Sequence, residues 1–167
     1  MKFEKHPVLQ EFDRLNNAID ELYHDICLMQ GLSDSAYAIL QAILVLGNGC
    51  TQTEIYKYTL LNKQTVNSSA KKLNQDGVIE FQAGVGRELK IYLTAKGEAL
   101  VREKILPIEQ VENKVFEEMT EKEHQEILRL VEKYLTSFRL SLIHISLFPN
   151  PIDLRNKNVN YQLLHLF

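Results

Sequence analysis

The sequence predicts a mainly α-helical protein with one small β-hairpin. Apolar residues recur at steps of three and four over several long stretches, which is the spacing of one helical face. Clean strand-like alternation occurs in residues 90–94, just after a glycine-containing turn. No apolar run reaches about 18 residues, so we expect no membrane-spanning helix.

Length and composition indicate an ordinary globular protein. The chain has 167 residues, of which 45% are hydrophobic and 25% charged, which suits one domain or one domain with an appended arm. The charged and periodic N-terminus does not fit a secretory signal. Two cysteines, Cys27 and Cys50, do not make a disulfide framework, so we expect a reducing, cytoplasmic setting.

The first predicted helix covers residues 7–30 and ends at Gly31. Its apolar stripe either packs within its own subunit or forms half of a dimer interface. Together with the C-terminal helices, a stripe this long and this close to a terminus favours the dimer. The stripe consists of Leu9, Phe12, Leu15, Ile19, Leu22 and Ile26.

Capping residues divide the next stretch. Ser33 is a good N-cap for a helix over 34–46. Thr51 and Glu54 have the spacing of a capping box, which predicts a short helix that begins there. The expected anchors of that helix are Ile55 and Tyr58.

A fourth helix is expected to begin after Asn62, a further N-cap, and to bury Val66, Ala70 and Leu73. Its outer face has no carboxylate and consists of residues that bind base edges or phosphates. A merely solvated face usually mixes both charges, so DNA contact is favoured. The outer residues are Lys63, Gln64, Asn67, Ser68, Lys71 and Gln75.

A basic hairpin follows this helix. Gly77 ends the helix, and strands over 78–82 and 90–94 flank a glycine-rich turn with Arg87 at or just past its tip. A basic helix followed by a basic hairpin is the outline of a winged helix-turn-helix, which binds duplex DNA. We expect Arg87 to reach a narrow minor groove.

The net charge of −3 conceals an asymmetry. Seven positive and four negative residues between positions 51 and 97 give +3, and the remainder of the chain therefore carries −6. A basic centre on an acidic body suits phosphate binding without indiscriminate adhesion.

Two further helices are expected. Thr94 caps a fifth helix that Pro107 should kink or interrupt, and a capping box at Thr120 opens a sixth. From about residue 143 the composition changes, and residues 140–147 alternate loosely as an edge strand does. No function is assigned to this tail.

These residues resemble the MarR family of bacterial transcription regulators. The resemblance rests on residues 61–73, on Asp76 to Ile79, on Gly86 to Glu88 and on Ile91 to Gly97. It implies a homodimer that binds pseudo-palindromic double-stranded DNA, most often as a repressor released by a small, often phenolic, ligand. It also implies a winged-helix domain over 33–97 and dimerisation helices at 1–32 and 98–142, and it leaves out the tail over 143–167.

The expected site residues follow from this scheme. Base recognition would fall to Gln64, Thr65, Asn67 and Ser68, and phosphate or minor-groove contact to Lys63, Lys71, Lys72, Arg87 and Lys90. The expected walls of an effector pocket are Tyr23, Met29 and Tyr37, for each of which core packing is the alternative. The family's wing often has an aspartate where this chain has Val85.

Other chemistries are weaker alternatives. Cys27 or Cys50 could sense oxidants, with Cys50 favoured by its expected loop position and Cys27 expected to pack in the core. The winged helix could instead bind a protein partner without binding DNA. We expect no metal site from His24 and Cys27, no cofactor, and no enzymatic motif.

Overall fold

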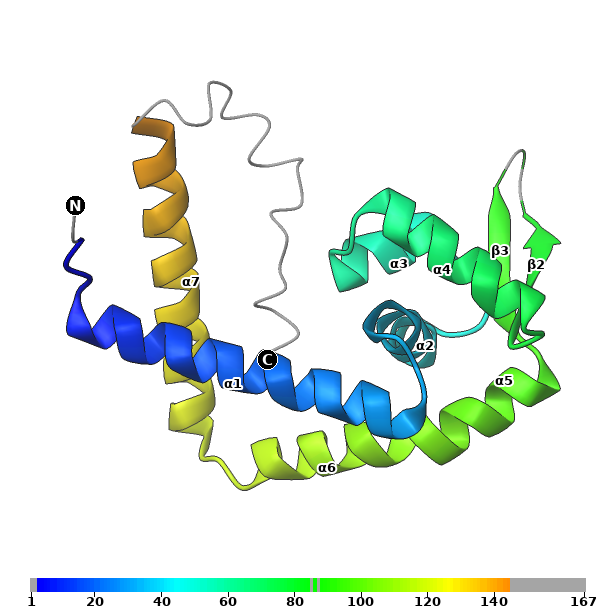
Figure 1. Ribbon diagram of the computed structural model, residues 1–167, viewed down its shortest axis with the longest axis horizontal. Coiled ribbons are helices and arrows are strands. Elements are labelled where there is room, and N and C mark those ends of the chain that lie inside the picture. Colours follow the sequence, from blue (N-terminus) through cyan, green and yellow to red (C-terminus); the bar gives the residue numbers. More distant parts are fainter. Residues whose placement is uncertain (1–2, 85, 87, 145–167) are drawn as a thin grey trace. The chain divides into compact units, whose positions relative to one another are not determined.

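The computed structural model of the chain describes residues 3–84, 86 and 88–144 (Figure 1). Val85, Arg87 and the tail from residue 145 lie outside the described residues, as do the predictions made for them. Within the described part there are two compact units, residues 3–105 and residues 106–144.

The first unit begins with two helices that start and end where the sequence predicted. Helix α1 covers Pro7–Gln30 and ends at Gly31, whose φ of 67° is a conformation that glycine adopts at little cost. Helix α2 covers Asp34–Leu46, with the Ser33 side chain accepting a hydrogen bond from the Ala36 N–H. Its residues Ile39, Leu40 and Ile43 are at most 1% exposed and form the centre of the core.

Helices α3 (Gln52–Thr59) and α4 (Lys63–Gln75) pack against α2 (Figure 1). The predicted capping box is confirmed, since Glu54 N–H donates to Thr51 and the Glu54 carboxylate accepts from Thr51. The prediction that Tyr58 anchors α3 is wrong, because the Tyr58 side chain is 42% exposed. Thr59 is buried instead. It lies four residues after Ile55 and so nearly on the same helical face, whereas Tyr58, three residues after Ile55, is turned further from that face.

A three-stranded antiparallel sheet has the order β1-β3-β2, with β1 at Cys50–Thr51, β2 at Ile79–Ala83 and β3 at Leu89–Leu93. The hairpin of β2 and β3 is the predicted wing. Strand β1 was not predicted, because two residues are too few to show alternation. Cys50 therefore lies in a strand paired with Ile91, and the expected loop position is wrong.

The expected fifth helix is divided into three segments: α5 (Ala95–Leu100), the π-helical segment η1 (Val101–Ile105) and α6 (Leu106–Glu117). The predicted interruption is confirmed, although it comes before Pro107 instead of at it. Proline has no N–H and its ring conflicts with the carbonyl four residues earlier, so a wider turn preceding it relieves both problems.

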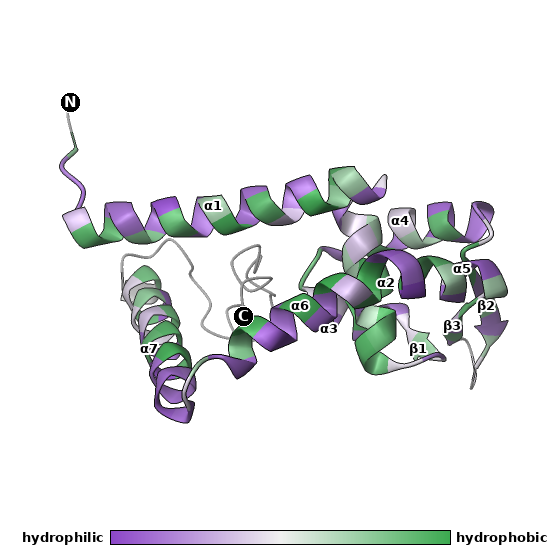
Figure 2. Ribbon diagram, turned by 90° about the horizontal axis from the view of Figure 1, so that it is seen from below, coloured by the Kyte–Doolittle hydropathy of each residue, from purple (hydrophilic) through white to green (hydrophobic). Residues whose placement is uncertain are grey.

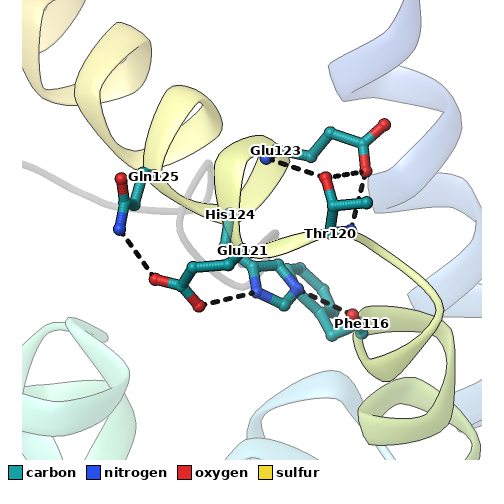
Figure 3. A network of polar contacts seen from close by, with 6 residues as sticks. All are labelled: Phe116, Thr120, Glu121, Glu123, His124 and Gln125. Atoms are coloured by element: carbon teal, nitrogen blue, oxygen red, sulfur yellow. Dashed lines mark hydrogen bonds and ion pairs between the residues drawn. The ribbon is translucent and has the colours of Figure 1, made fainter.

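The second unit consists of α6 and α7 (Glu121–His144), joined by a turn with a polar network (Figure 3). Thr120 N–H and its hydroxyl donate to the Glu123 carboxylate at 2.7 and 2.6 Å, which confirms the second capping box and lowers the pKa of Glu123. His124 Nε2 lies 2.7 Å from the Phe116 carbonyl oxygen, and the two rings are stacked. This network fixes the start of α7.

Helix α7 continues through His144, so the prediction of an edge strand over residues 140–147 is wrong for residues 140–144. Hydrophobic bands recur along both α1 and α7 (Figure 2). Among the described helices no single one has the length and apolarity to cross a bilayer; only α1 and α2 together, across a 90° bend, meet those criteria.

Candidate DNA interface and cavity

Helix α4 has one buried face and one polar face. Asn62 caps it by accepting from the Thr65 N–H at 2.8 Å, as predicted. Val66, Ala70 and Leu73 are at most 4% exposed and hold the helix against α2 and α3. The opposite face is therefore fixed in orientation, and its exposed residues are Lys63, Gln64, Ser68, Lys71 and Gln75, with Thr65 and Asn67 half-buried.

The lysines of α4 differ in their surroundings. The Lys63 ammonium lies 5.0 Å from the centre of the Tyr56 ring on α3, a cation–π contact that the sequence did not reveal. Lys72 Nζ is 3.8 Å from Asp76 Oδ2. Lys71 is exposed and has no hydrogen-bond or ion-pair partner among the described residues, so of the three it is the most available to a phosphate. The Ser68 hydroxyl donates to the Thr65 carbonyl of its own helix at 3.0 Å.

On the wing, Lys90 lies in β3 opposite Gln82 and Thr51. The pKa of Glu54 is lowered by the hydrogen bonds it accepts from Thr51, and further by the charges of Lys90 and Lys57. The Lys90 ammonium is thus close to a carboxylate, which reduces the net charge that it offers to DNA.

The turn from α3 to α4 is under backbone strain. Leu60 has a φ of 57°, the left-handed region, and among the described residues no other side chain outside glycine has a positive φ. Thr59 stabilises the turn, since its hydroxyl donates to the Ile55 carbonyl at 2.9 Å and accepts from the Leu61 N–H at 3.3 Å. Strain of this kind is held in place by surrounding packing and is common at functional segments.

Comparison with known proteins identifies this module. A sequence model of the MarR family matches residues 30–88, which include α2, α3, α4 and β2. This segment is a MarR family winged helix. MarR family proteins are transcription regulators and not enzymes. No curated protein matches the chain.

Solved structures share the fold well beyond that segment. A MarR family regulator from Neisseria meningitidis is 23% identical with a TM-score of 0.70, covering 83% of this chain and 99% of its own. MepR of S. aureus, solved in complex with DNA, is 18% identical with a TM-score of 0.63, covering 76% and 93%. BpsR of Bordetella bronchiseptica, whose DNA binding 6-hydroxynicotinic acid regulates, is 19% identical with a TM-score of 0.58, covering 80% and 99%.

A cavity of about 210 Å³ lies between α1 and α2. Each helix contributes residues at steps of three and four, which is one helical face. The lining residues are Asp20, Tyr23, His24, Cys27, Asp34, Tyr37, Ala38, Gln41 and Leu61. The structure thus brings together two of the three expected pocket residues.

Met29, the third, does not line this cavity and is 76% exposed. Met29 is six positions after Tyr23 on α1, which places its side chain about 120° from Tyr23 around the helix axis and away from the cavity. The sequence did not predict the other lining residues as pocket walls, although the spacing of Asp20 from Tyr23 and Cys27 could have indicated Asp20. These other residues are Asp20, His24, Cys27, Asp34, Ala38, Gln41 and Leu61.

A small polar cluster lies at one edge of the cavity. His24 Nδ1 is 3.0 Å from Asp34 Oδ1 and 3.1 Å from Oδ2, so the imidazole links α1 to the first turn of α2. Among the described residues no group of three or more His, Cys, Asp or Glu side chains could hold a metal ion.

The two thiols are buried. Cys27 is 3% and Cys50 6% exposed. Burial raises the pKa of Cys27 to about 12, with further contributions from the Asp34 charge and a hydrogen bond to it, and burial likewise raises the pKa of Cys50. Because the thiolate is the reactive form, these environments argue against the redox-sensing alternative.

We expect the free energy of unfolding to fall as pH rises above about 9, because an unfolded thiol ionises near pH 8.5 while Cys27 stays protonated to about pH 12. This thiol alone contributes a slope of about 1.4 kcal/mol per pH unit. Urea titrations from pH 8 upwards should therefore show a flatter pH dependence for Cys27→Ala than for the parent. Parallel curves would show that folding does not suppress ionisation of Cys27.

Proposed function

We propose that the chain is a homodimeric transcriptional repressor that binds a pseudo-palindromic operator through α4 and is released by a small aromatic ligand. The observation that carries the proposal is the exposed face of α4. It offers lysine, amide and hydroxyl groups without a carboxylate on a helix whose other face is buried. Such a face suits the major groove, where amides bind base edges and lysines bind phosphates.

In this proposal residues 33–97 bind DNA, with Gln64, Thr65, Asn67 and Ser68 toward the bases. Lys63, Lys71, Lys72 and, less strongly because of Glu54, Lys90 lie toward the phosphates. Arg87 would contact the minor groove. The likeness to bacterial regulators favours a bacterial, cytoplasmic setting.

Exposed apolar side chains support a homodimer formed by residues 1–32 and 98–142. On α1, Leu15 and Leu22 are 47% and 57% exposed although they belong to the predicted apolar stripe. Large apolar residues this exposed are typical of interaction surfaces. On α6 and α7 the exposed apolar residues are Val111, Val115, Leu128, Leu130, Tyr134, Phe138 and Leu140.

The position of the cavity supports the proposal of ligand release. Leu61 lines it one residue before the N-cap of α4, and the Ser35 hydroxyl, next to Asp34, lies 2.8 Å from the Ser69 hydroxyl on α4. A ligand that displaces Leu61 or the Ser35 hydroxyl would change the contacts that fix the position of α4. To weaken operator binding a hundredfold, it must bind the DNA-free form better by about 2.7 kcal/mol.

The test is an electrophoretic shift assay with the DNA upstream of the chain's own gene. We expect a retarded band with two chains per duplex, and an affinity that falls steeply with salt because each neutralised phosphate adds about 0.9 to the slope. Absence of any retardation at low salt would refute the repressor proposal and favour a protein-binding winged helix.

A further inference from the structure

Two adjacent serines of α4 form hydrogen bonds in different directions. The Ser68 hydroxyl donates to the Thr65 carbonyl of its own helix at 3.0 Å, which is the usual kind of partner for a helical serine. The Ser69 hydroxyl instead lies 2.8 Å from the Ser35 hydroxyl in the first turn of α2, and one of the two donates to the other. The Ser35–Ser69 pair therefore joins α4 to a neighbouring helix by a directional bond.

Ser69 lies at the edge of the buried face of α4. Val66, Ala70 and Leu73 are at most 4% exposed, whereas Ser69 is half-buried. At 3.6 residues per turn, Ser69 is about 60° from Val66 around the helix axis and about 160° from Asn67 on the outer face. Apolar contacts have no preferred direction, but a hydrogen bond weakens steeply when its angle is bent. A bond at this edge therefore resists rotation of α4 about its own axis.

The α2 end of the pair is itself held in place. Asp34 precedes Ser35, and its carboxylate oxygen lies 3.0 Å from His24 Nδ1 on α1. The thiol of Cys27, also on α1, donates a further hydrogen bond to Asp34. The Ser35 hydroxyl thus offers Ser69 a fixed partner. Supporting hydrogen bonds of this kind are needed wherever a binding group must be placed to within a fraction of an ångström.

Rotation of α4 would affect its two kinds of DNA contact unequally. Side-chain atoms lie about 5–6 Å from a helix axis, so a rotation of about 10° moves them by about 1 Å. An amide that reads a base edge needs two well-aligned hydrogen bonds, which such a shift disrupts. A lysine is a point charge on a flexible stem and can follow a phosphate over the same distance. Loss of rotational control therefore costs base recognition and little of the phosphate binding.

We propose that Ser35 and Ser69 are positioning residues for operator recognition. Their bond fixes the rotation of α4 and so sets the discrimination between operator and unrelated DNA, although neither hydroxyl is assigned a contact with DNA. This inference rests on the proposed function, in which the amides of Gln64 and Asn67 read base edges.

Fluorescence anisotropy of the full-length chain, with labelled operator and with an unrelated duplex of the same length, tests the pair. Ser69→Ala should weaken operator binding by about tenfold, because each half-site loses part of its base contacts. Binding to the unrelated duplex should change by less than about twofold, and the salt slope should stay the same, because no phosphate contact is lost. Ser35→Ala should act alike from a different helix. Unchanged discrimination in either variant would overturn the proposal.

The double variant shows whether the two hydroxyls act as a pair. If their bond is the cause, the Ser35→Ala/Ser69→Ala variant should lose about tenfold in operator affinity, no more than either single variant does. Losses that multiply to about a hundredfold would show that the two hydroxyls act separately, and the proposal would then be wrong.

Two controls separate positioning from stability. Ile39→Val removes one fully buried methylene from α2 and leaves its polar groups unchanged. Ser141→Ala removes a hydroxyl that donates to the Ser137 carbonyl of its own helix at 2.9 Å. Both should keep the discrimination of the parent, although Ile39→Val should lower the melting temperature. A loss of discrimination in Ile39→Val equal to that in Ser69→Ala would assign the effect to stability and overturn the proposal.

The parent protein separates this inference from the proposed function. If the parent retards no DNA at low salt, the proposed function fails and the role of the Ser35–Ser69 pair fails with it. If the parent prefers the operator and both serine variants prefer it equally strongly, the proposed function stands and only the role of the pair is refuted.

Discussion

Replacing Gly97 with alanine should lower the free energy of unfolding by about 3 kcal/mol or more. Gly97 is buried in the first turn of α5, and an added Cβ would lie 2.0 Å from the Val78 carbonyl oxygen and 3.2 Å from Leu93 Cδ2. For a chain of this size the corresponding fall in melting temperature is about 10 °C. Thermal unfolding followed by circular dichroism measures it.

Relieving the clash costs free energy, because the contacted atom is the backbone carbonyl oxygen of Val78 and two hydrogen bonds hold it in place. The Val78 carbonyl accepts from the Thr94 N–H at 3.1 Å and from the Thr94 hydroxyl, also at 3.1 Å. Thr94 in turn caps α5 by accepting from the Gly97 N–H. A shift of α5 away from Val78 would therefore break the cap and the junction between the wing and the helix.

Intrinsic helix propensity predicts the opposite change in stability, so the sign of the measured change distinguishes the two effects. Alanine favours a helix over glycine by about 1 kcal/mol, so without the clash Gly97→Ala would stabilise the protein. Gly77→Ala is the control, since Gly77 has a φ of 69° and an added Cβ there meets nothing within 4 Å. It should cost only about 1 kcal/mol of backbone strain. A smaller loss for Gly97→Ala than for Gly77→Ala would contradict the packing that we describe.

Local chemistry explains why much of this fold could be predicted. Ser33, Thr51, Asn62, Thr94 and Thr120 each cap the helix that the sequence assigned to it. A capping residue bonds to backbone groups within three or four residues, so a short stretch of sequence is enough to predict where the helix begins. The buried face of α4 was predictable for the same reason, because its residues recur with the helical period within one short segment.

What could not be predicted depends on residues far apart in the chain. The pairing of β1 with β3, the Tyr56 ring beneath Lys63 and the link from His24 to Asp34 are set by tertiary packing. A pocket wall assigned from residue type alone can face either way on a helix, and Met29 does face away. Helical spacing relative to Tyr23 would have separated Asp20 from Met29.

The second large effect concerns DNA binding through α4. Lys71→Ala should weaken binding to operator and to unrelated DNA alike, by about tenfold or more at moderate salt. One lost phosphate contact in each subunit of a dimer should flatten the salt slope by about two. Asn67→Ala should leave the slope unchanged and instead relax the preference for one base in each half-site, which is worth about 1–3 kcal/mol. Anisotropy titrations over a salt series measure both quantities.

The contrast follows from position on the helix. Lys71 is exposed without a partner among the described residues, so its ammonium can reach the backbone of any sequence. Asn67 is half-buried one turn earlier and lies deeper in the surface that would face the groove. Lys133→Ala on α7 and Asn113→Ala on α6 are matched controls that remove the same groups outside α4 and should change neither quantity. If Lys71→Ala and Asn67→Ala behaved identically, the division of α4 into phosphate-binding and base-reading positions would be wrong.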